Sequence, residues 1–358
     1  MTEQLDLFSS FQPDETPAPP PAPTPARAPA TVASPSRQPS PVRRATIRPL
    51  PDNGLPKDPS GRAADLGEAV AGVWHKQHGG TRIEVPIGLV AALCFVRQKD
   101  AHGPGLKAQI LAQDDRQLIA MYRQIWSAQW LHRPDLIDRA RILHEWLNDA
   151  EEPDKHRTYV VRAVTKTILD RGLLELTGHA DPYLRAQADV LSPTLTALRS
   201  LGAQQGLGEY HTPSPISDSI AEVLLGELTT EMFTDHLKNL KPQQHIHDPA
   251  AGSGGMLRSA AQKLRREGLD PADFRWSMVD IDPIAAACAA VNALTWGLGP
   301  RVTVACADTL ANPHAVEDAM AQARAVIEHR DRVVGQAHMI AAIRRTQHLL
   351  EQTTATAA

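Results

Sequence analysis

Apolar residues recur every three or four positions through residues 62–200, which is the period of an amphipathic helix. Asp114 and Asp115 precede one such stretch, and Pro134 stands in the first turn of another, as is usual for helix starts. We therefore expect an all-α region without an evident chemical task. Its helices are predicted over residues 64–78, 86–99, 114–132, 134–150 and 157–172.

From residue 208 the pattern changes to short apolar strands that alternate with helices. Strands are expected over 244–247, 276–281 and 302–307, with helices over 256–267 and 284–296 between them. This alternation is typical of a parallel sheet with crossover helices. The pattern predicts an α/β, partial Rossmann-like domain of three parallel strands, followed by one or two Ala-rich helices over 313–352.

Composition separates the N-terminal segment from the rest. About half of the 29 prolines precede residue 60. Such a segment buries too little apolar surface to offset the entropy of ordering it, so we expect a disordered tail over 1–62. Its arginines have no acid between them, which favours a solvated basic linker over an arm that follows phosphates; they are Arg27, Arg37, Arg43, Arg44 and Arg48. A helical domain over 63–200, a βα domain over 201–312 and C-terminal helices over 313–358 complete the expected division.

Net charge, cysteine spacing and the length of the apolar runs argue against several classes of protein. The 358 residues carry a formal net charge of −4, so no global positive field points to nucleic acid, although a local patch or a partner could supply one. Cys94, Cys288 and Cys306 are too scattered for a disulfide or zinc framework, and we expect no metal. The longest apolar run, 86–96, is about half of the ~20 residues that span a bilayer. With no signal-peptide pattern, a soluble, cytoplasmic protein is expected.

A glycine-rich turn follows the first predicted strand, in the sequence His-Asp-Pro-Ala-Ala-Gly-Ser-Gly-Gly-Met-Leu over 247–257. Small residues let a ligand approach the backbone, and the helix that begins there offers unpaired amides. The turn therefore predicts a nucleotide-type site, while a tight turn without a ligand is the alternative reading. Its candidate binding residues are Asp248, Pro249, Ala250, Gly252, Ser253 and Gly254.

Acidic residues end the second and third predicted strands. In doubly wound folds an acid at the position of Asp280 accepts hydrogen bonds from ribose hydroxyls. Asp308, at the end of the third strand, is placed to meet the base of the same ligand. Asp282, followed by Pro283, is expected to cap a helix instead. Each acid alone could be a cap or a loop charge, but acids at successive strand ends favour a binding site.

The glycine-rich turn resembles the S-adenosylmethionine motif of adenine-specific DNA methylases, particularly the modification subunits of type I restriction systems. Gly-Glu-Tyr-His-Thr-Pro over 208–213 resembles the Gly-x-Phe/Tyr-x-Thr-Pro element that precedes this motif in the family. The resemblance covers about 206–310 and implies a class I methyltransferase fold, S-adenosylmethionine as cofactor and DNA as substrate. By the same resemblance, Tyr210, Thr212 and Pro213 lie over the methionine end of the cofactor.

The chain departs from that family where the family places its catalytic motif. The expected Asn/Asp-Pro-Pro-aromatic tetrapeptide and its apolar fourth strand are not found; the nearest string is Asn-Pro-His-Ala, beginning at Asn312 and Pro313. A base must be held in a pocket for chemistry to occur on it. Two readings stay open: an adenine methylase, completed if necessary by a partner subunit, or a catalytically inactive cofactor-binding subunit that regulates or scaffolds a DNA-associated complex. A small-molecule methyltransferase fits the fold but not the motifs.

Two further expectations concern partners. The peptide Gln-Leu-Asp-Leu-Phe near the N-terminus resembles the motif that binds the bacterial sliding clamp. Leu5, Leu7 and Phe8 would fill an apolar groove and Gln4 would add polar contacts, although a chance amphipathic terminus is equally open. The first strand, near Ile246, would have an open edge without a fourth strand. We expect the C-terminal helices, the helical domain or another subunit to cover it.

Overall fold

The computed structural model describes residues 55–78, 82–98, 105–148, 155–199, 212, 214–225 and 244–356. The proposed clamp peptide, with Gln4, Leu5, Leu7 and Phe8, lies outside these residues, as do Tyr210 and Pro213. The methylase-like segment is described from the first strand onward, together with Thr212 and the helix that follows it.

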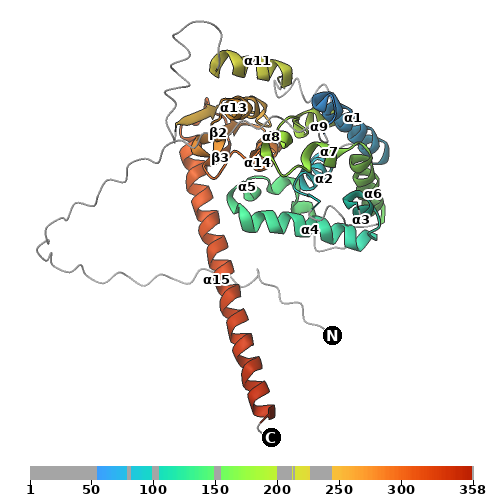
Figure 1. The fold of residues 1–358 in the computed structure, drawn as a ribbon, viewed down its shortest axis with the longest axis vertical. Coiled ribbons are helices and arrows are strands. Elements are labelled where there is room, and N and C mark those ends of the chain that lie inside the picture. The colour runs from blue at the N-terminus through green and yellow to red at the C-terminus, as the bar shows by residue number, and fades with distance from the viewer. Residues whose placement is uncertain are drawn as a thin grey trace, which may run out of the picture. The chain divides into compact units, whose positions relative to one another are not determined.

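Helices precede the sheet, as the three-to-four periodicity predicts (Figure 1). They are α1 (Pro59–His78), α2 (Glu84–Cys94), α3 (Leu106–Leu111), α4 (Asp115–His132), α5 (Pro134–Arg139), α6 (Lys155–Asp170), α7 (Leu173–Thr177), α8 (Pro182–Arg185), α9 (Leu191–Leu198) and α11 (Ser214–Leu225). The expected start of α4 is confirmed. Asp114 accepts the Gln117 amide at 2.8 Å, and the Gln117 side chain accepts the Asp114 amide at 3.0 Å.

The predicted single helix over 134–150 is wrong in its length. Pro134 begins α5 as expected, but the helix ends at Arg139, and two 3₁₀ segments follow (Arg141–Leu143 and Glu145–Asn148). A tertiary contact accompanies this change: a Cβ on Gly88 would lie 1.9 Å from the Leu143 carbonyl oxygen. Helix α2 therefore packs directly on this backbone, and close packing overrides the helical periodicity there.

The sheet consists of three parallel strands in the order β1 (His245–Asp248), β2 (Arg275–Asp280) and β3 (Val302–Cys306). Helix α13 (Gly255–Arg266) connects β1 to β2, and α14 (Pro283–Thr295) connects β2 to β3, with a 3₁₀ turn over Pro271–Asp273. The three predicted parallel strands and the partial Rossmann-like class are confirmed. The long α15 (Ala315–Thr356) packs its first turns, through Ala315 and Ala319, on Val279 and Ala305 of the sheet.

One hydrophobic cluster joins the helices to the sheet. Trp74 and Tyr122 of the helical region belong to the same buried cluster as Trp276 of β2 and Trp296 after α14. Polar contacts cross the same boundary, because the Arg185 guanidinium donates to the Thr295 carbonyl at 2.7 Å. The helical region thus forms part of the support of the sheet. Among the described residues, no helix is both long and apolar enough to span a membrane.

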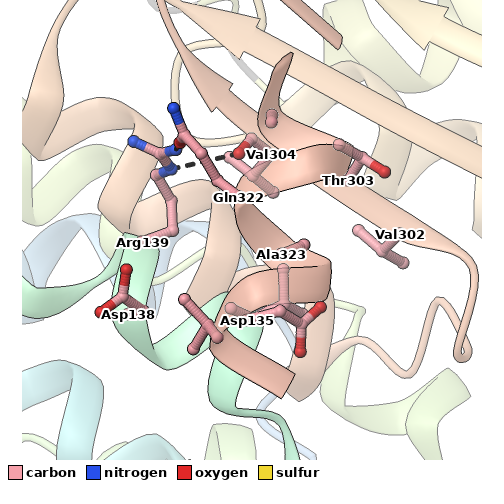
Figure 2. A pocket seen from close by; sticks show the side chains of 11 residues that line it. Asp135, Asp138, Arg139, Val302, Thr303, Val304, Gln322 and Ala323 are labelled. Carbon is pink, nitrogen blue, oxygen red and sulfur yellow. Dashed lines mark hydrogen bonds between the residues drawn. The ribbon is translucent and has the colours of Figure 1, made fainter. Parts of the chain in front are cut away.

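The two edges of the sheet differ. At the outer edge of β3, Arg139 of α5 donates to the Val304 carbonyl at 3.1 Å and to the Gln322 side chain of α15 at 2.9 Å. Figure 2 shows the small hollow that these elements leave beside β3. On the other side, β1 pairs with β2, while His245 and His247 are exposed. Of the three covers expected for β1, the C-terminal helix α15 packs instead chiefly on β3, β2 and α5. The helical domain or another subunit stays the prediction for that edge.

Candidate cofactor site

The glycine-rich turn bends sharply between β1 and α13. Gly252 and Gly254 have φ values of 55° and 91°, in the left-handed region that favours glycine. A Cβ on Gly254 would lie 3.0 Å from the Met278 sulfur, so the turn also fits closely against β2. The φ of Gly254 therefore favours glycine, and a Cβ there would also require the Met278 side chain to shift. The turn leaves the backbone of Gly252 half-exposed at the carboxyl end of the sheet, where open α/β sheets bind ligands.

Asp280 connects this turn to the end of β2. One carboxylate oxygen accepts the Gly252 amide at 2.7 Å and the other accepts the Asp282 amide at 2.9 Å. A carboxylate oxygen has two lone pairs, so each oxygen retains one for another donor. The structure therefore brings together two elements that the sequence places 28 positions apart. Asp282 caps α14 through the Ile284 and Ala285 amides, as predicted.

Asp248 ends β1 beneath the same turn, and its carboxylate accepts the Ala250 amide at 3.1 Å. Burial raises the pKa of Asp248 above its ordinary value, and the nearby charge of Asp280 raises it further, against the opposing effects of the Ala250 amide and His247. Two acids thus face one small region. A bound positive charge there would relieve the cost of keeping Asp248 ionised.

The loop after β3 also reaches the glycine-rich turn. The Thr309 hydroxyl donates to the Pro249 carbonyl at 3.2 Å, which brings the ends of β1 and β3 together. Asp308 is exposed, and its carboxylate accepts the Leu310 amide of its own loop at 2.9 Å. The loops after β1 and β3 are therefore in contact at the carboxyl end of the sheet.

Ser253 has surroundings that the sequence does not reveal. Its side chain is 1% exposed and lies 2.6 Å from the Ser192 hydroxyl, and it donates to Asp189 at 3.3 Å. These partners belong to the segment around α9, so the hydroxyl faces the helical region. Only the backbone of Ser253 is placed to meet a ligand in the turn.

Part of the chain matches a known protein family in sequence. Residues 196–329, a little over a third of the chain, match the sequence model of a family described as N-6 DNA methylase. Over these residues the chain is therefore similar in sequence to the N-6 DNA methylase family. The match includes α11, the three strands, both crossover helices and the first turns of α15.

Other comparisons add little to this assignment. A solved structure of the type I restriction-modification system methyltransferase subunit from Streptococcus thermophilus has 14% identity and a TM-score of 0.35, covering 70% of this chain. The chain spans 60% of that protein's length. No functional conclusion follows from a likeness at that score. No curated protein matches the chain significantly in sequence.

Asn312 and Pro313, the catalytic candidates, lie between β3 and α15 in the segment that matches the N-6 DNA methylase model. The Asn312 side-chain oxygen accepts the His314 amide at 2.9 Å, and its nitrogen donates to Asp318 at 3.0 Å. These bonds fasten the start of α15, which accounts for an asparagine here without any role in chemistry.

Two exposed apolar residues beside the strand-end acids could not be identified from the sequence. Ile281 is 58% exposed directly after Asp280, and Leu310 is 97% exposed after Asp308. Large exposed apolar groups beside acids indicate a surface that a flat apolar ligand could cover. Exposure cannot be read from the sequence, because both residues continue apolar patterns.

A polar cluster lies on the sheet near its open edge. His245 Nε2 and His247 Nδ1 lie 2.7 and 2.6 Å from the buried Ser277 hydroxyl. Burial lowers the pKa of His245, and the charges of Arg275 and His247 add to this effect. The His-x-His spacing on an expected strand could have revealed this shared face, because alternate residues point to one side.

Thr212 stands at the start of α11, which packs on α13. The Ser217 hydroxyl donates to the Thr212 carbonyl at 3.4 Å, and Asp218 of α11 pairs with Arg258 of α13 at 2.8 Å. This pairing ties the predicted Thr-Pro element to the helix that begins at the glycine-rich turn.

Proposed function

We propose that residues 201–312 form the S-adenosylmethionine-binding part of an adenine-specific DNA methylase. The observation that carries this proposal is the arrangement of carboxylates around the glycine-rich turn. Asp248 and Asp280 lie at the turn itself, and Asp308 lies on the adjoining loop. Such a site favours a ligand that carries positive charge over one that carries phosphates.

A buried acid strengthens the argument against a dinucleotide. Dinucleotide folds hold their pyrophosphate at the N-terminus of the helix that follows the glycine-rich turn. Here the buried Asp189 carboxylate lies beside the first residue of that helix: its Oδ2 lies 3.6 Å from where a Cβ of Gly255 would stand. A further acid therefore lies near the positive end of α13. S-adenosylmethionine carries a sulfonium, an ammonium and one carboxylate group, so its net charge is positive, and it has no phosphate; it therefore suits these surroundings better than a dinucleotide does.

The residues present fit such a cofactor. The turn at Gly252 admits a ligand close to the backbone, and the remaining lone pairs of Asp280 suit two ribose hydroxyls. Ile281 and Leu310 suit the faces of a purine, with Asp308 at its edge. When bound, the cofactor supplies an electrophilic methyl group. Adenine is proposed as the methylated base from the match to the N-6 DNA methylase model, and Tyr210, Thr212 and Pro213 keep their proposed role at the methionine end.

The second candidate function is cofactor binding without catalysis, in a regulatory or scaffold subunit. It is favoured by Asn312, whose side chain is bonded at the start of α15. It is also favoured by the sheet, which has three strands within the described residues. A partner subunit that supplies the base pocket would reconcile this arrangement with methyl transfer.

Two measurements on the full chain test these proposals. Equilibrium binding should detect S-adenosylmethionine and S-adenosylhomocysteine but neither NAD nor ATP; preference for NAD would overturn the cofactor assignment. Transfer of a tritiated methyl group to DNA by the purified chain would then establish catalysis. Binding without transfer, restored by adding a partner subunit, supports the split methylase. Binding without transfer under any of these conditions supports the regulatory role.

A further inference from the structure

Helix α9 contacts both segments of the candidate cofactor site, one with each end. Before its first turn, Asp189 accepts the Ser192 amide at 3.1 Å and the Ser253 hydroxyl at 3.3 Å. Asn292 of α14 donates to the Ser253 carbonyl at 2.9 Å and to Asp189 at 3.4 Å. The amino end of α9 is therefore bonded to the glycine-rich turn.

The carboxyl end of α9 reaches the segment after β2. Arg199, the residue that ends the helix, forms an ion pair with Asp282. Asp282 in turn caps α14, and its backbone amide donates to Asp280 at 2.9 Å. This ion pair is buried, and such pairs add little net stability because both charges lose water. The ion pair instead fixes the position of the loop that carries Asp280.

The contacts close into a ring, because Asp280 also accepts the Gly252 amide at 2.7 Å. The ring runs from Asp189 through Ser253 to Asp280, then through Asp282 and Arg199 back along α9. Three of these links join segments distant in sequence: Ser253 to Asp189, Gly252 to Asp280, and Arg199 to Asp282. A change in the position of α9 would therefore alter both sides of the site.

Helix α1 sets the position of α9. A Cβ on Gly67 would lie 2.8 Å from the Thr194 backbone nitrogen and 2.9 Å from the Pro193 carbonyl carbon. Backbone lies on the other side of this contact, so it cannot yield as a flexible side chain would. Gly72 lies on the same helix with nothing within 4 Å of its Cβ position. Helix α1 therefore contains one glycine packed against backbone, Gly67, and one with open space around it, Gly72.

We propose that α9 is a brace that holds the glycine-rich turn and the Asp280 loop in their binding geometry, with Asp189 and Arg199 as positioning residues. The helical region then supports the cofactor site, and none of its described residues needs to touch the cofactor. The identity of the ligand rests on the proposed function; the mechanical link does not, because it is built from contacts within the chain.

The sharpest test compares two alanine substitutions on α1. Gly67→Ala should push α9 outward, raise the Kd for S-adenosylmethionine about tenfold, equivalent to about 1.4 kcal/mol, and speed amide hydrogen exchange in the turn and the Asp280 loop. Gly72→Ala should leave both measurements unchanged. Equal Kd values and equal exchange in the two variants would overturn the brace.

A second set of variants guards against simple loss of folding. Asp189→Ala removes the acceptor for Ser253 and should raise the Kd about tenfold, while Asp189→Asn, which keeps an acceptor oxygen, should recover most of the affinity. Tyr122→Phe removes a buried hydrogen bond to Thr165 (2.8 Å) elsewhere in the helical region and serves as the stability control. If Tyr122→Phe lowers Tm as much as Asp189→Ala and also weakens binding as much, the effect is general destabilisation and the positioning role is wrong.

The two proposals fail in different ways. If the folded wild-type chain binds no S-adenosylmethionine, the proposed function fails, and hydrogen exchange in Gly67→Ala still decides whether α9 controls the turn. If the wild-type chain binds and exchange is unaltered in both Gly67→Ala and Asp189→Ala, the brace fails while the proposed function stands.

Discussion

The turns after β1 and β3 contain similar residues, an acid followed by small or turn-forming residues, but they are held in different ways. The turn after β1 is fixed by distant segments: Gly252 bonds to Asp280 and Ser253 bonds to Asp189. In the turn after β3, Asp308 and Asn312 bond mostly to backbone and side chains a few positions away. Thr309, which donates to Pro249, is the long-range exception.

The difference indicates which turn is built for a ligand. Long-range bonds add to the local preference of the glycines in holding the turn after β1, and preorganisation of this kind favours binding. Local bonds at Asp308 and Asn312 are those of an ordinary loop and helix start. We therefore expect substitutions around the first turn to affect the cofactor strongly and those around the second to affect it weakly.

The largest effect is expected at Gly254. Gly254→Ala places a Cβ at a φ of 91°, 3.0 Å from the Met278 sulfur, and should cost about 1–3 kcal/mol of stability while abolishing detectable cofactor binding. Gly255→Ala is the matched control, because its Cβ would make only an ordinary contact at 3.6 Å. Thermal unfolding and calorimetric titration measure both effects; equal stability of the two variants would refute the strained geometry of the turn.

Asp280→Ala should follow. It removes the acceptor proposed for the ribose hydroxyls, so binding should weaken by about 1.5–3 kcal/mol, or roughly 10- to 150-fold in Kd. Two backbone amides, of Gly252 and Asp282, also lose their acceptor, so Tm should fall as well. An unchanged Kd would show that the ligand does not meet the end of β2.

Asp248→Asn should raise the stability of the fold while lowering its affinity for the cofactor. Because the folded-state pKa of Asp248 is raised, its ionised form costs stability at neutral pH, and the neutral amide should raise Tm by about 1–3 °C. The gain should shrink as the pH falls through the raised pKa towards the ordinary value of 3.8, where the wild-type acid is also protonated. Cofactor affinity should fall severalfold. A lower Tm at neutral pH would contradict this account.

Asp308→Ala should have a smaller effect on binding, about 1 kcal/mol, because the acid is exposed and already bonds to its own loop. The comparison with Asp280→Ala is best made under one set of conditions by titration calorimetry. A loss as large as that of Asp280→Ala would mean that the two turns contribute equally.

Asn312→Ala should be the mildest substitution. Loss of its bonds to His314 and Asp318 should reduce stability by up to about 1 kcal/mol, as expected for a helix start, with no change in cofactor affinity. Urea unfolding and the same titration measure the two quantities. Loss of methyl transfer with unaltered affinity would instead return Asn312 to the catalytic candidates.

The elements whose patterns are local could be predicted from the sequence. The three strands lie within one or two residues of their expected bounds, and Asp114, Pro134 and Asp282 stand at helix starts for the predicted reasons. Asp280 could be placed because the end of a parallel strand has a fixed position relative to its neighbours. These features depend on periodicity, capping and strand order alone.

Features that depend on tertiary packing could not be predicted. The end of α5 at Arg139 accompanies the contact between Gly88 and Leu143, which are 55 positions apart. Ser253 belongs to a motif whose residues suggest ligand contact, yet its side chain bonds to the segment around α9. The exposure of Ile281 likewise depends on which neighbours cover it. No local pattern encodes such contacts.

The most direct test of the central claim is calorimetric titration of the full chain with S-adenosylmethionine, beside the variant Gly252→Val. Gly252 has a φ of 55° and lies beside Asp280, so a valine there would obstruct the turn. We predict that the wild-type chain binds one cofactor per chain with saturation and that the variant binds none. Circular dichroism should show that both proteins are folded. Absence of binding by the folded wild-type chain, or equal binding by Gly252→Val, would contradict the account.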